Sequence, residues 1–459
     1  MLQQEIINNI FETTEIDDRL FEKKVWTETP AQNFIQDNQS QPNKFIFSSI
    51  NLKDNFLLVR EGYIEFQIHF MRNNSGAFVA TDKYSIRNHV MSLFESIEIQ
   101  ISDSDHKIEE LRFMEHWANI NFLLQWSKEY SESFGEECLF SKDYPLAQIT
   151  KTLTDDVTAD SFDPSKPSAN KGLILRHNYI KNAQLICTLF LKDLPFFNSF
   201  HGIFTKSRFR IILTPNYNRS LIYIIADAAA GETGGMTHKF SKANLLIPEV
   251  TLMNKSKLQI LEKFNSGFTK NHKWISVEPF QSQQFAANIQ NIQWTISSEI
   301  RKPSWIYLVL VPDYTETDLP KKITQIYNTW NVTSYSLLIN NKEAFNESNV
   351  SFNSLKAHKL YQFVKQNMTA SNDRESLNVG SQISYLDFCN LYRIFCFNLN
   401  DIDANSIYNS RSDGSCSIVF RATVTAVNKP LVIYSFIERE KEIAFNYKNG
   451  SLDISLTSL

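Results

Sequence analysis

A period of two dominates the hydrophobic pattern of this chain and constrains its fold more than any other feature. Residues 63–70 alternate apolar with polar side chains, the apolar set being Ile64, Phe66, Ile68 and Phe70. The same alternation runs through residues 96–101, 292–296 and 418–427. Because successive side chains of a strand point to opposite faces, this pattern places one face on a core and the other in solvent. It is typical of antiparallel sheets.

Other segments are apolar on both faces and predict central strands of a sandwich: residues 185–191, 209–213, 306–311 and 431–436. Helical spacing is rarer. It is clearest in residues 108–126 and 355–366, where apolar side chains recur at intervals of three and four. Strands with a few short helices between them predict an all-β fold. Glycine and proline number only 12 and 13, so the turns are expected to rely on Asn, Asp and Ser.

The predicted strands divide into two sets of similar plan, one running from Lys44 to Met253 and the other from Trp274 to Ile443. The 459 residues are enough for two sandwiches with separate cores. The predicted organisation is an N-terminal arm (1–42), a first sandwich (43–253), a basic, solvated connector (254–273) and a second sandwich with a C-terminal tail (274–459). The arm is acidic and carries apolar residues at helical spacing, which predicts docking on a partner surface; these residues are Ile6, Ile7, Ile10 and Phe11.

Composition and charge exclude several classes of protein. The 46 Lys and Arg against 50 Asp and Glu leave a net charge of −4, without the positive surplus that a nucleic-acid coat requires. The 35 Phe, 17 Tyr and 7 Trp are too much apolar surface for a disordered chain. The most apolar runs, residues 221–230 and 305–311, are shorter than the ~18–20 residues that span a bilayer. The acidic N-terminus does not have the pattern of a signal peptide.

The cysteines indicate a reducing, intracellular compartment. They are odd in number and scattered, without a CxxC pair: Cys138, Cys187, Cys389, Cys396 and Cys416. This pattern predicts neither a disulfide framework nor a zinc ribbon. Because an aromatic-rich run separates Cys389 from Cys396, we expect these two to be small buried hydrophobic residues.

A search for catalytic and ligand-binding motifs predicts no catalytic, cofactor-binding or metal-binding residues, and hence no enzyme. The glycines of residues 231–235 lack the Lys-Ser/Thr pair of a phosphate-binding loop. The nine histidines include no pair at metal-ligand spacing. Two clusters are candidates for a hard metal ion, but we expect both to be solvated turns: Asp103, Asp105 and His106, and Asp155, Asp156, Asp160 and Asp163. No pair of carboxylates stands out as the acid and base of a glycosidase.

Several segments, in the same order along the chain, resemble the double jelly-roll major capsid proteins of the polinton-like and adintovirus-like lineage, which is related to the virophages. In the first half they are residues 43–70, residues 88–101 with the helical stretch after them, and residues 246–252. In the second half they are residues 274–280, 292–296, 304–312, 331–340, 388–398 and 417–439. The resemblance covers most of residues 43–445, whereas residues 131–171 match nothing in that family.

The resemblance implies a structural protein with two consecutive jelly rolls in place of the two predicted sandwiches. Members of that family form homotrimers of pseudo-hexagonal outline, which tile an icosahedral virus shell. The partners implied are further copies of the chain and penton or minor capsid proteins, without a membrane span or sequence-specific nucleic acid. The localisation implied is the virion, assembled inside the host cell, with the N-terminal arm on the inner side of the shell.

Three alternatives remain open from the sequence. A β-sandwich adhesin or lectin-like binding module should show a secretory signal, disulfides or clustered loop aromatics. An enzyme would need catalytic residues, and no set of residues stands out. A penton or minor capsid protein with a single jelly roll would leave half of the chain unused. The mass of the protein in solution distinguishes the monomeric module from a trimeric capsid protein.

Overall fold

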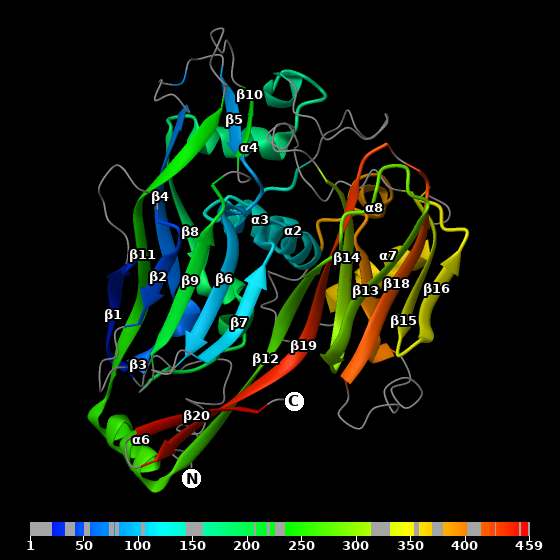
Figure 1. Ribbon diagram of the computed structural model, residues 1–459. Coiled ribbons are helices and arrows are strands. Elements are labelled where there is room, and N and C mark those ends of the chain that lie inside the picture. The colour runs from blue at the N-terminus through cyan, green and yellow to red at the C-terminus, as the bar shows by residue number, and fades with distance from the viewer. Residues whose placement is uncertain are drawn as a thin grey trace.

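The chain folds into two β-sandwiches that lie side by side, the first half of the sequence on the left of Figure 1 and the second half on the right. The computed structural model describes residues 21–32, 42–49, 56–72, 78, 82–101, 106–143, 159–205, 208–217, 221–224, 235–313, 331–352, 358–369, 380–401, 415–426, 428–448 and 451–457. Strands account for 52% and helices for 23%, which confirms the all-β prediction.

The first sandwich consists of two antiparallel sheets and a short ribbon. One sheet has the order β1-β11-β4-β8, with β3 paired to β11; its strands are β1 (Phe21–Pro30), β3 (Phe56–Leu57), β4 (Tyr63–Arg72), β8 (Gln184–Phe190) and β11 (Met236–Leu252). The other has the order β2-β9-β6-β7, from β2 (Phe45–Ser48), β6 (Phe94–Ile101), β7 (His106–Arg112) and β9 (Phe209–Pro215). The ribbon pairs β5 (Lys83–Ile86) with β10 (Leu221–Ile224).

The alternating residues 63–70 lie in β4, as predicted, and their apolar face lines the core. Phe66 of β4 is fully buried and packs against Phe94 and Phe45 of the opposite sheet, with ring centroids 5.0 and 6.1 Å apart. Phe240 of β11 joins them at 4.8 Å from Phe45. Tilted and edge-on ring pairs of this kind add to the stabilisation from burial. An aromatic cluster between the sheets therefore forms the centre of the first core.

The second sandwich repeats the plan. One sheet has the order β12-β19-β14-β17, with β20 paired to β19; its strands are β12 (Phe268–Gln281), β14 (Pro303–Pro312), β17 (Phe395–Asn398), β19 (Leu431–Lys448) and β20 (Ser451–Thr457). The other has the order β13-β18-β15-β16, from β13 (Asn291–Arg301), β15 (Val332–Ile339), β16 (Lys342–Ser348) and β18 (Ser415–Val424). Tyr335 and Phe397 meet between the sheets at 5.7 Å.

The segments predicted to be apolar on both faces are central strands in three cases. Residues 306–311 lie in β14, between β19 and β17, residues 209–213 lie in β9, between β2 and β6, and residues 431–436 lie in β19, between β12 and β14. The prediction is wrong for residues 185–191, because β8 ends the path of its sheet among the described strands. Its Ile186 is 62% exposed. An apolar run shows only that the side chains are hydrophobic. It does not show whether the strand lies in the middle or at the edge of its sheet.

The α-helices in the described part of the chain are α2 (Met114–Gln125), α3 (Lys128–Ser133), α4 (Lys171–Ile180), α5 (Pro195–Asn198), α6 (Asn254–Ser266), α7 (His358–Thr369) and α8 (Tyr385–Asn390). The helix predicted at residues 355–366 corresponds to α7. The helix predicted over residues 108–126 is wrong in its first part, which forms β7 and pairs with β6. Phe113, in the left-handed conformation with φ 57°, separates β7 from α2. Cross-strand pairing overrides the helical spacing there.

Two of the predicted connecting regions are more structured than expected. Residues 21–30 of the predicted arm form β1, which pairs with β11. The arm residues Ile6, Ile7, Ile10 and Phe11 lie outside the described residues. In the predicted connector, α6 buries Ile260 and Phe264, and β12 begins at Phe268. Phe264 stacks on Tyr447 at 4.2 Å, so this stretch packs on β19 and is not a solvated linker.

Candidate functional site

The two sandwiches meet along a buried seam, which we define as α2, α5 and β7 of the first against β12, β14 and β19 of the second (Figure 1). Trp117 of α2 packs against Phe436 and Tyr307, with ring centroids 5.5 and 6.0 Å apart. Phe196 of α5 packs against Trp274 at 5.2 Å. Helix α2 is buried nearly all round, including its polar Glu115, His116 and Asn119. The seam thus has an aromatic core of its own.

A buried carboxylate crosses the seam. Glu109 of β7 accepts hydrogen bonds from Trp274 Nε1 at 2.7 Å, from Ser276 Oγ at 2.8 Å and from the amide of Val277 at 3.3 Å. All three donors belong to β12. Burial raises the pKa of Glu109, while Lys441 and these hydrogen bonds act in the opposite direction. A buried carboxylate is tolerated only with such partners, and these come from the other sandwich.

A second polar contact lies at the upper end of the seam, beside α8. Lys142 Nζ lies 2.5 Å from Oδ2 of Asp387, and Lys142 also donates to the carbonyl of Gln382. The Tyr392 hydroxyl donates to the carbonyl of Asp143 at 2.5 Å. The Asp143 carboxylate pairs with the buried Arg176 at 2.7 Å. The bonds of Lys142 and Tyr392 cross between the two sandwiches and hold them in one relative position, and Arg176 secures Asp143 within the first.

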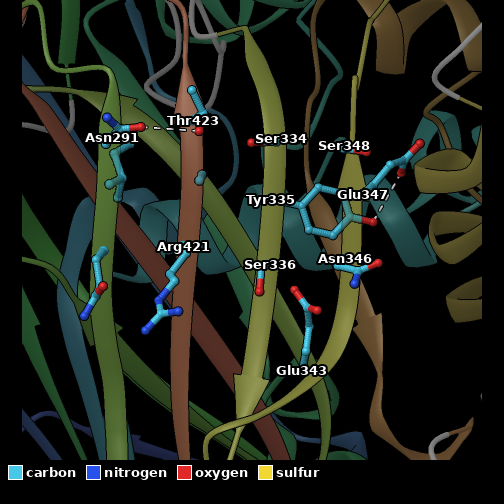
Figure 2. Close-up of a pocket in the computed structure, with 13 residues that line it drawn as sticks. Asn291, Ser334, Tyr335, Ser336, Glu343, Asn346, Glu347, Ser348, Arg421 and Thr423 are labelled. Carbon is cyan, nitrogen blue, oxygen red and sulfur yellow. Dashed lines mark hydrogen bonds between the residues drawn. The ribbon is translucent and has the colours of Figure 1, made fainter.

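A polar hollow of about 500 Å³ lies on the outer face of the β13-β18-β15-β16 sheet (Figure 2). Glu343 of β16 and Arg421 of β18 project into it, among Asn and Ser side chains. Hydrogen bonds from Asn346 and Ser336 lower the pKa of Glu343. Tyr335 donates to Glu347 over a distance of 3.4 Å. This surface is suited to hydrogen bonding with another molecule.

The structure tests the sequence candidates only in part. Asp103, Asp105, Asp155 and Asp156 lie outside the described residues, as does the side chain of His106. Asp160 is exposed, and Asp163 accepts from the amide and hydroxyl of Ser165 at 3.0 and 2.6 Å, which closes a local turn. All five cysteines are in the described part of the chain; each is buried, and none forms a disulfide.

One group of side chains escaped the sequence search. His89, Cys138 and Asp193 converge in the first sandwich, although they come from segments far apart in the chain. No local motif marks them, because a motif search detects ligands close in sequence and these meet only through the fold.

None of the described helices is long and apolar enough to cross a membrane.

Two consecutive sandwiches, each of two antiparallel sheets, define a double jelly-roll fold. No protein-family model matches the sequence, and a search of curated proteins finds no match either. Solved structures with this fold do match over nearly the whole chain.

Three of these structures come from viruses. A chain of the Sputnik virophage structure superposes with a TM-score of 0.59 at 13% identity, covering 98% of this chain and 91% of that one. The mavirus major capsid protein gives 0.53 at 11% identity, covering 98% and 93%. The PBCV-1 protein VP54, fitted into a reconstruction of Sputnik, gives 0.51 at 11% identity, covering 98% and 99%. At such identities the likeness establishes the fold.

Proposed function

We propose that this chain is a major capsid protein whose homotrimer forms a pseudo-hexameric capsomer in the icosahedral shell of a DNA virus. The observation that carries the proposal is the extent of the structural match, which includes both jelly rolls and nearly all of each chain. A binding module built on one sandwich would align with only half of such a protein. The sequence resemblance to the polinton-like and adintovirus-like lineage supports the same role.

The seam supports this role physically. A shell subunit must keep its outline while many copies pack around it, so its two halves cannot move independently. Aromatic packing around Trp117 and the bonds made by Glu109 and Lys142 join the jelly rolls into one unit. The near-neutral net charge of −4 fits association through apolar contacts and not through nucleic acid.

Within this proposal, residues 43–253 and 274–459 are the two jelly rolls, and the arm at residues 1–42 lies on the inner side of the shell. Penton or minor capsid proteins are the further partners, and the protein resides in the virion after assembly inside the host cell. The proposal includes no catalytic activity and no cofactor.

The mass of the full chain in solution tests the proposal. The protein is expressed alone, treated with nuclease and measured by light scattering at low and high salt. We expect a trimer under both conditions, because apolar association survives moderate salt and strengthens with sulfate. Negative-stain images should show particles of hexagonal outline. A monomer throughout, or a species that dissociates once nucleic acid is removed, contradicts the proposal.

A lectin-like binding module is the second candidate, and the polar hollow around Glu343 and Arg421 is what favours it. This function requires the hollow to bind a soluble ligand and needs no trimer. A glycan array probed with the monomeric protein, with Arg421→Ala as the control for the hollow, distinguishes the two candidates.

A further inference from the structure

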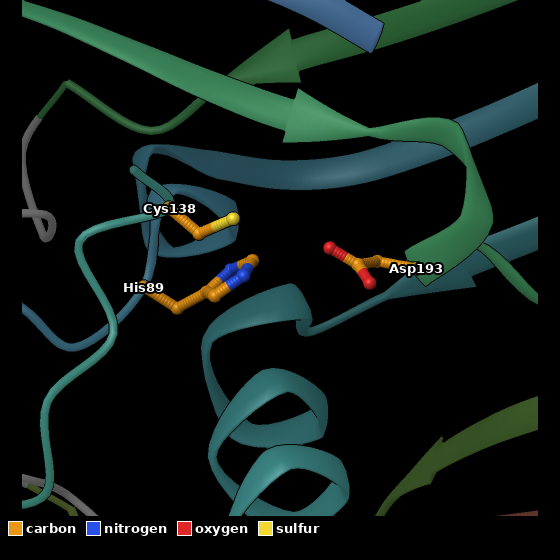
Figure 3. Close-up of side chains that lie close together, drawn as sticks. All are labelled: His89, Cys138 and Asp193. Atoms are coloured by element: carbon orange, nitrogen blue, oxygen red, sulfur yellow. The ribbon is translucent and has the colours of Figure 1, made fainter. Parts of the chain in front are cut away.

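Three connections of the first jelly roll bring a histidine, a cysteine and an aspartate to one place (Figure 3). His89 precedes the 3-10 turn η3 (Val90–Leu93), Cys138 lies in the turns after α3, and Asp193 ends the 3-10 turn η6 (Leu191–Asp193). Their nitrogen, sulfur and oxygen atoms all lie within 4.8 Å of one another. The three side chains point toward a common centre.

The polar atoms of this cluster are buried without the partners that burial demands. His89 and Cys138 are fully buried. Nε2 of His89 and Oδ2 of Asp193 have no hydrogen-bond partner, although both atoms are inaccessible to solvent. Buried polar atoms without partners are rare in native proteins, and each one needs an explanation. A cation between the three side chains would satisfy both atoms at once.

We propose that His89, Cys138 and Asp193 bind a divalent transition-metal ion, with zinc as the best fit, which ties the three connections together. Charge supports this assignment. On metal binding the Cys138 thiol releases its proton to solvent, and the thiolate, the carboxylate and a neutral imidazole then carry two negative charges together, which a divalent cation balances. A neutral cluster avoids the large cost of burying a net charge.

The ligand set selects the type of metal. Thiolate and imidazole are ligands of zinc and other borderline metals, whereas calcium and magnesium prefer oxygen. Three protein ligands leave a fourth tetrahedral position for water or for the second oxygen of Asp193. Asp193 is partly exposed as a residue, although Oδ2 of its carboxylate is buried.

The surroundings of the cluster add one positive charge. Lys192, next to Asp193, places its Nζ over the rings of Phe134, Phe190 and Tyr130 at 5.3, 5.4 and 5.6 Å. Its charge lowers the pKa of Asp193, against a larger rise caused by burial. Because Oδ2 of Asp193 has no hydrogen-bond partner, Lys192 does not bond to this oxygen. The metal would supply the missing contact.

Loading the metal has a consequence for the backbone. Nδ1 of His89 accepts a hydrogen bond from the Met91 amide at 3.0 Å, so a neutral imidazole here carries its proton on Nε2. Binding through Nε2 moves this proton to Nδ1, and the Met91 amide loses its acceptor. Metal binding therefore exchanges the Met91 hydrogen bond for a metal–nitrogen bond and changes the geometry at the start of η3.

Metal content and cobalt spectroscopy of the full chain test the proposal. Protein purified without chelator should contain about one zinc per chain by elemental mass spectrometry. After removal of zinc, cobalt(II) should bind with the visible absorption of a tetrahedral site and a sulfur-to-cobalt charge-transfer band. Chelation should lower Tm by about 5 °C.

Variants locate the site. Cys138→Ser should abolish the charge-transfer band, and Asp193→Asn should weaken cobalt binding by at least about 100-fold. Cys187→Ser is the matched control, since Cys187 is a buried thiol of the same jelly roll outside the cluster. It should keep both the metal and the band.

Two results overturn the proposal. One is a wild-type protein without bound metal and without the cobalt band, in which case a water or packing alone accounts for the cluster. The other is metal retained equally by wild type and Cys138→Ser, or lost only in Cys187→Ser. If Cys138→Ser does not fold, the metal content and cobalt spectrum of the wild type decide. None of these measurements depends on whether the protein forms a trimer.

Discussion

Trp274 Nε1 donates a hydrogen bond of 2.7 Å to Glu109 Oε2, and this bond joins β12 of the second jelly roll to β7 of the first. Both residues are buried. The other carboxylate oxygen of Glu109 accepts from Ser276 and Val277, which also belong to β12. The hydrogen bonding of Glu109 is therefore complete only when the jelly rolls are docked. This couples the folding of each half to the presence of the other.

The first prediction concerns Glu109 itself. Glu109→Ala leaves the Trp274 and Ser276 donors buried without an acceptor, and each such donor costs about 1–3 kcal/mol. We expect the free energy of unfolding to fall by about 3 kcal/mol in urea titrations. Glu110→Ala is the control, because Glu110 is half-buried and pairs with Lys107 at the surface; its loss should cost less than about 1 kcal/mol. Equal losses in the two variants would argue against a coupled seam.

The second prediction is that protonation of His272, a buried residue of the seam, lowers the stability of the protein in acid. Burial lowers the pKa of His272 to about 3, and the charge of Lys270 acts in the same direction. As the pH falls below the ordinary value of 6.5, the unfolded chain binds a proton that the folded chain does not. Titration of His272 therefore costs no stability above pH 6.5. As the pH falls from 6.5 to about 3, it progressively lowers the free energy of unfolding.

His272→Phe should make this decline less steep by up to about 1.4 kcal/mol per pH unit, the value for one proton. Urea titrations of both proteins across this pH range provide the measurement. His238, whose pKa burial lowers to about 4, gives a comparison outside the seam: the effect of His238→Phe should end near pH 4. An unchanged slope in His272→Phe would refute the assignment.

The third prediction is that Lys142 and Asp387 are coupled across the seam. Their 2.5 Å ion pair is largely buried, and Asp387 also caps α8 through Ser384. In a double-mutant cycle with alanine, the contribution of Asp387 to the helix cap cancels. The coupling energy between Lys142 and Asp387 should be about 1–2 kcal/mol. The exposed pair Lys273–Glu440, 3.2 Å apart, is the control and should show a much smaller coupling, because solvent screens it. Coupling no greater than that of the control pair would contradict the prediction.

The fourth prediction concerns the division into two jelly rolls. Limited trypsin digestion should cut first at the exposed start of α6 within residues 254–273, around Lys255, or within residues 131–171; the rest of 254–273 packs on β19 and should resist. The seam holds the two halves together through noncovalent contacts. The two fragments produced by cleavage within residues 254–273 should therefore still elute together from a sizing column. Early cleavage inside β14, whose residues are almost all buried, would refute the division.

Local hydrophobic patterns predicted the structure correctly where the pattern belongs to a single strand. The alternation of residues 63–70 predicted the buried face of β4 because the pleat sends every second side chain to the same face. The apolar run at residues 306–311 predicted β14 for a related reason, since a strand covered on both faces needs apolar residues throughout. Two sandwiches in sequence, and their order, followed from where such strands begin and end.

The sequence by itself determined most of the central strands, the two-part plan and the absence of a disulfide pattern, because these depend on residue type and short-range period. Only the tertiary structure decided that residues 108–112 pair as β7, that Glu109 meets Trp274, and that His89, Cys138 and Asp193 converge. The physical reason is that each of these contacts joins segments brought together by sheet pairing and docking of the jelly rolls. The sequence pattern of a segment indicates which secondary structure the segment prefers. Packing in three dimensions decides which other segment it contacts.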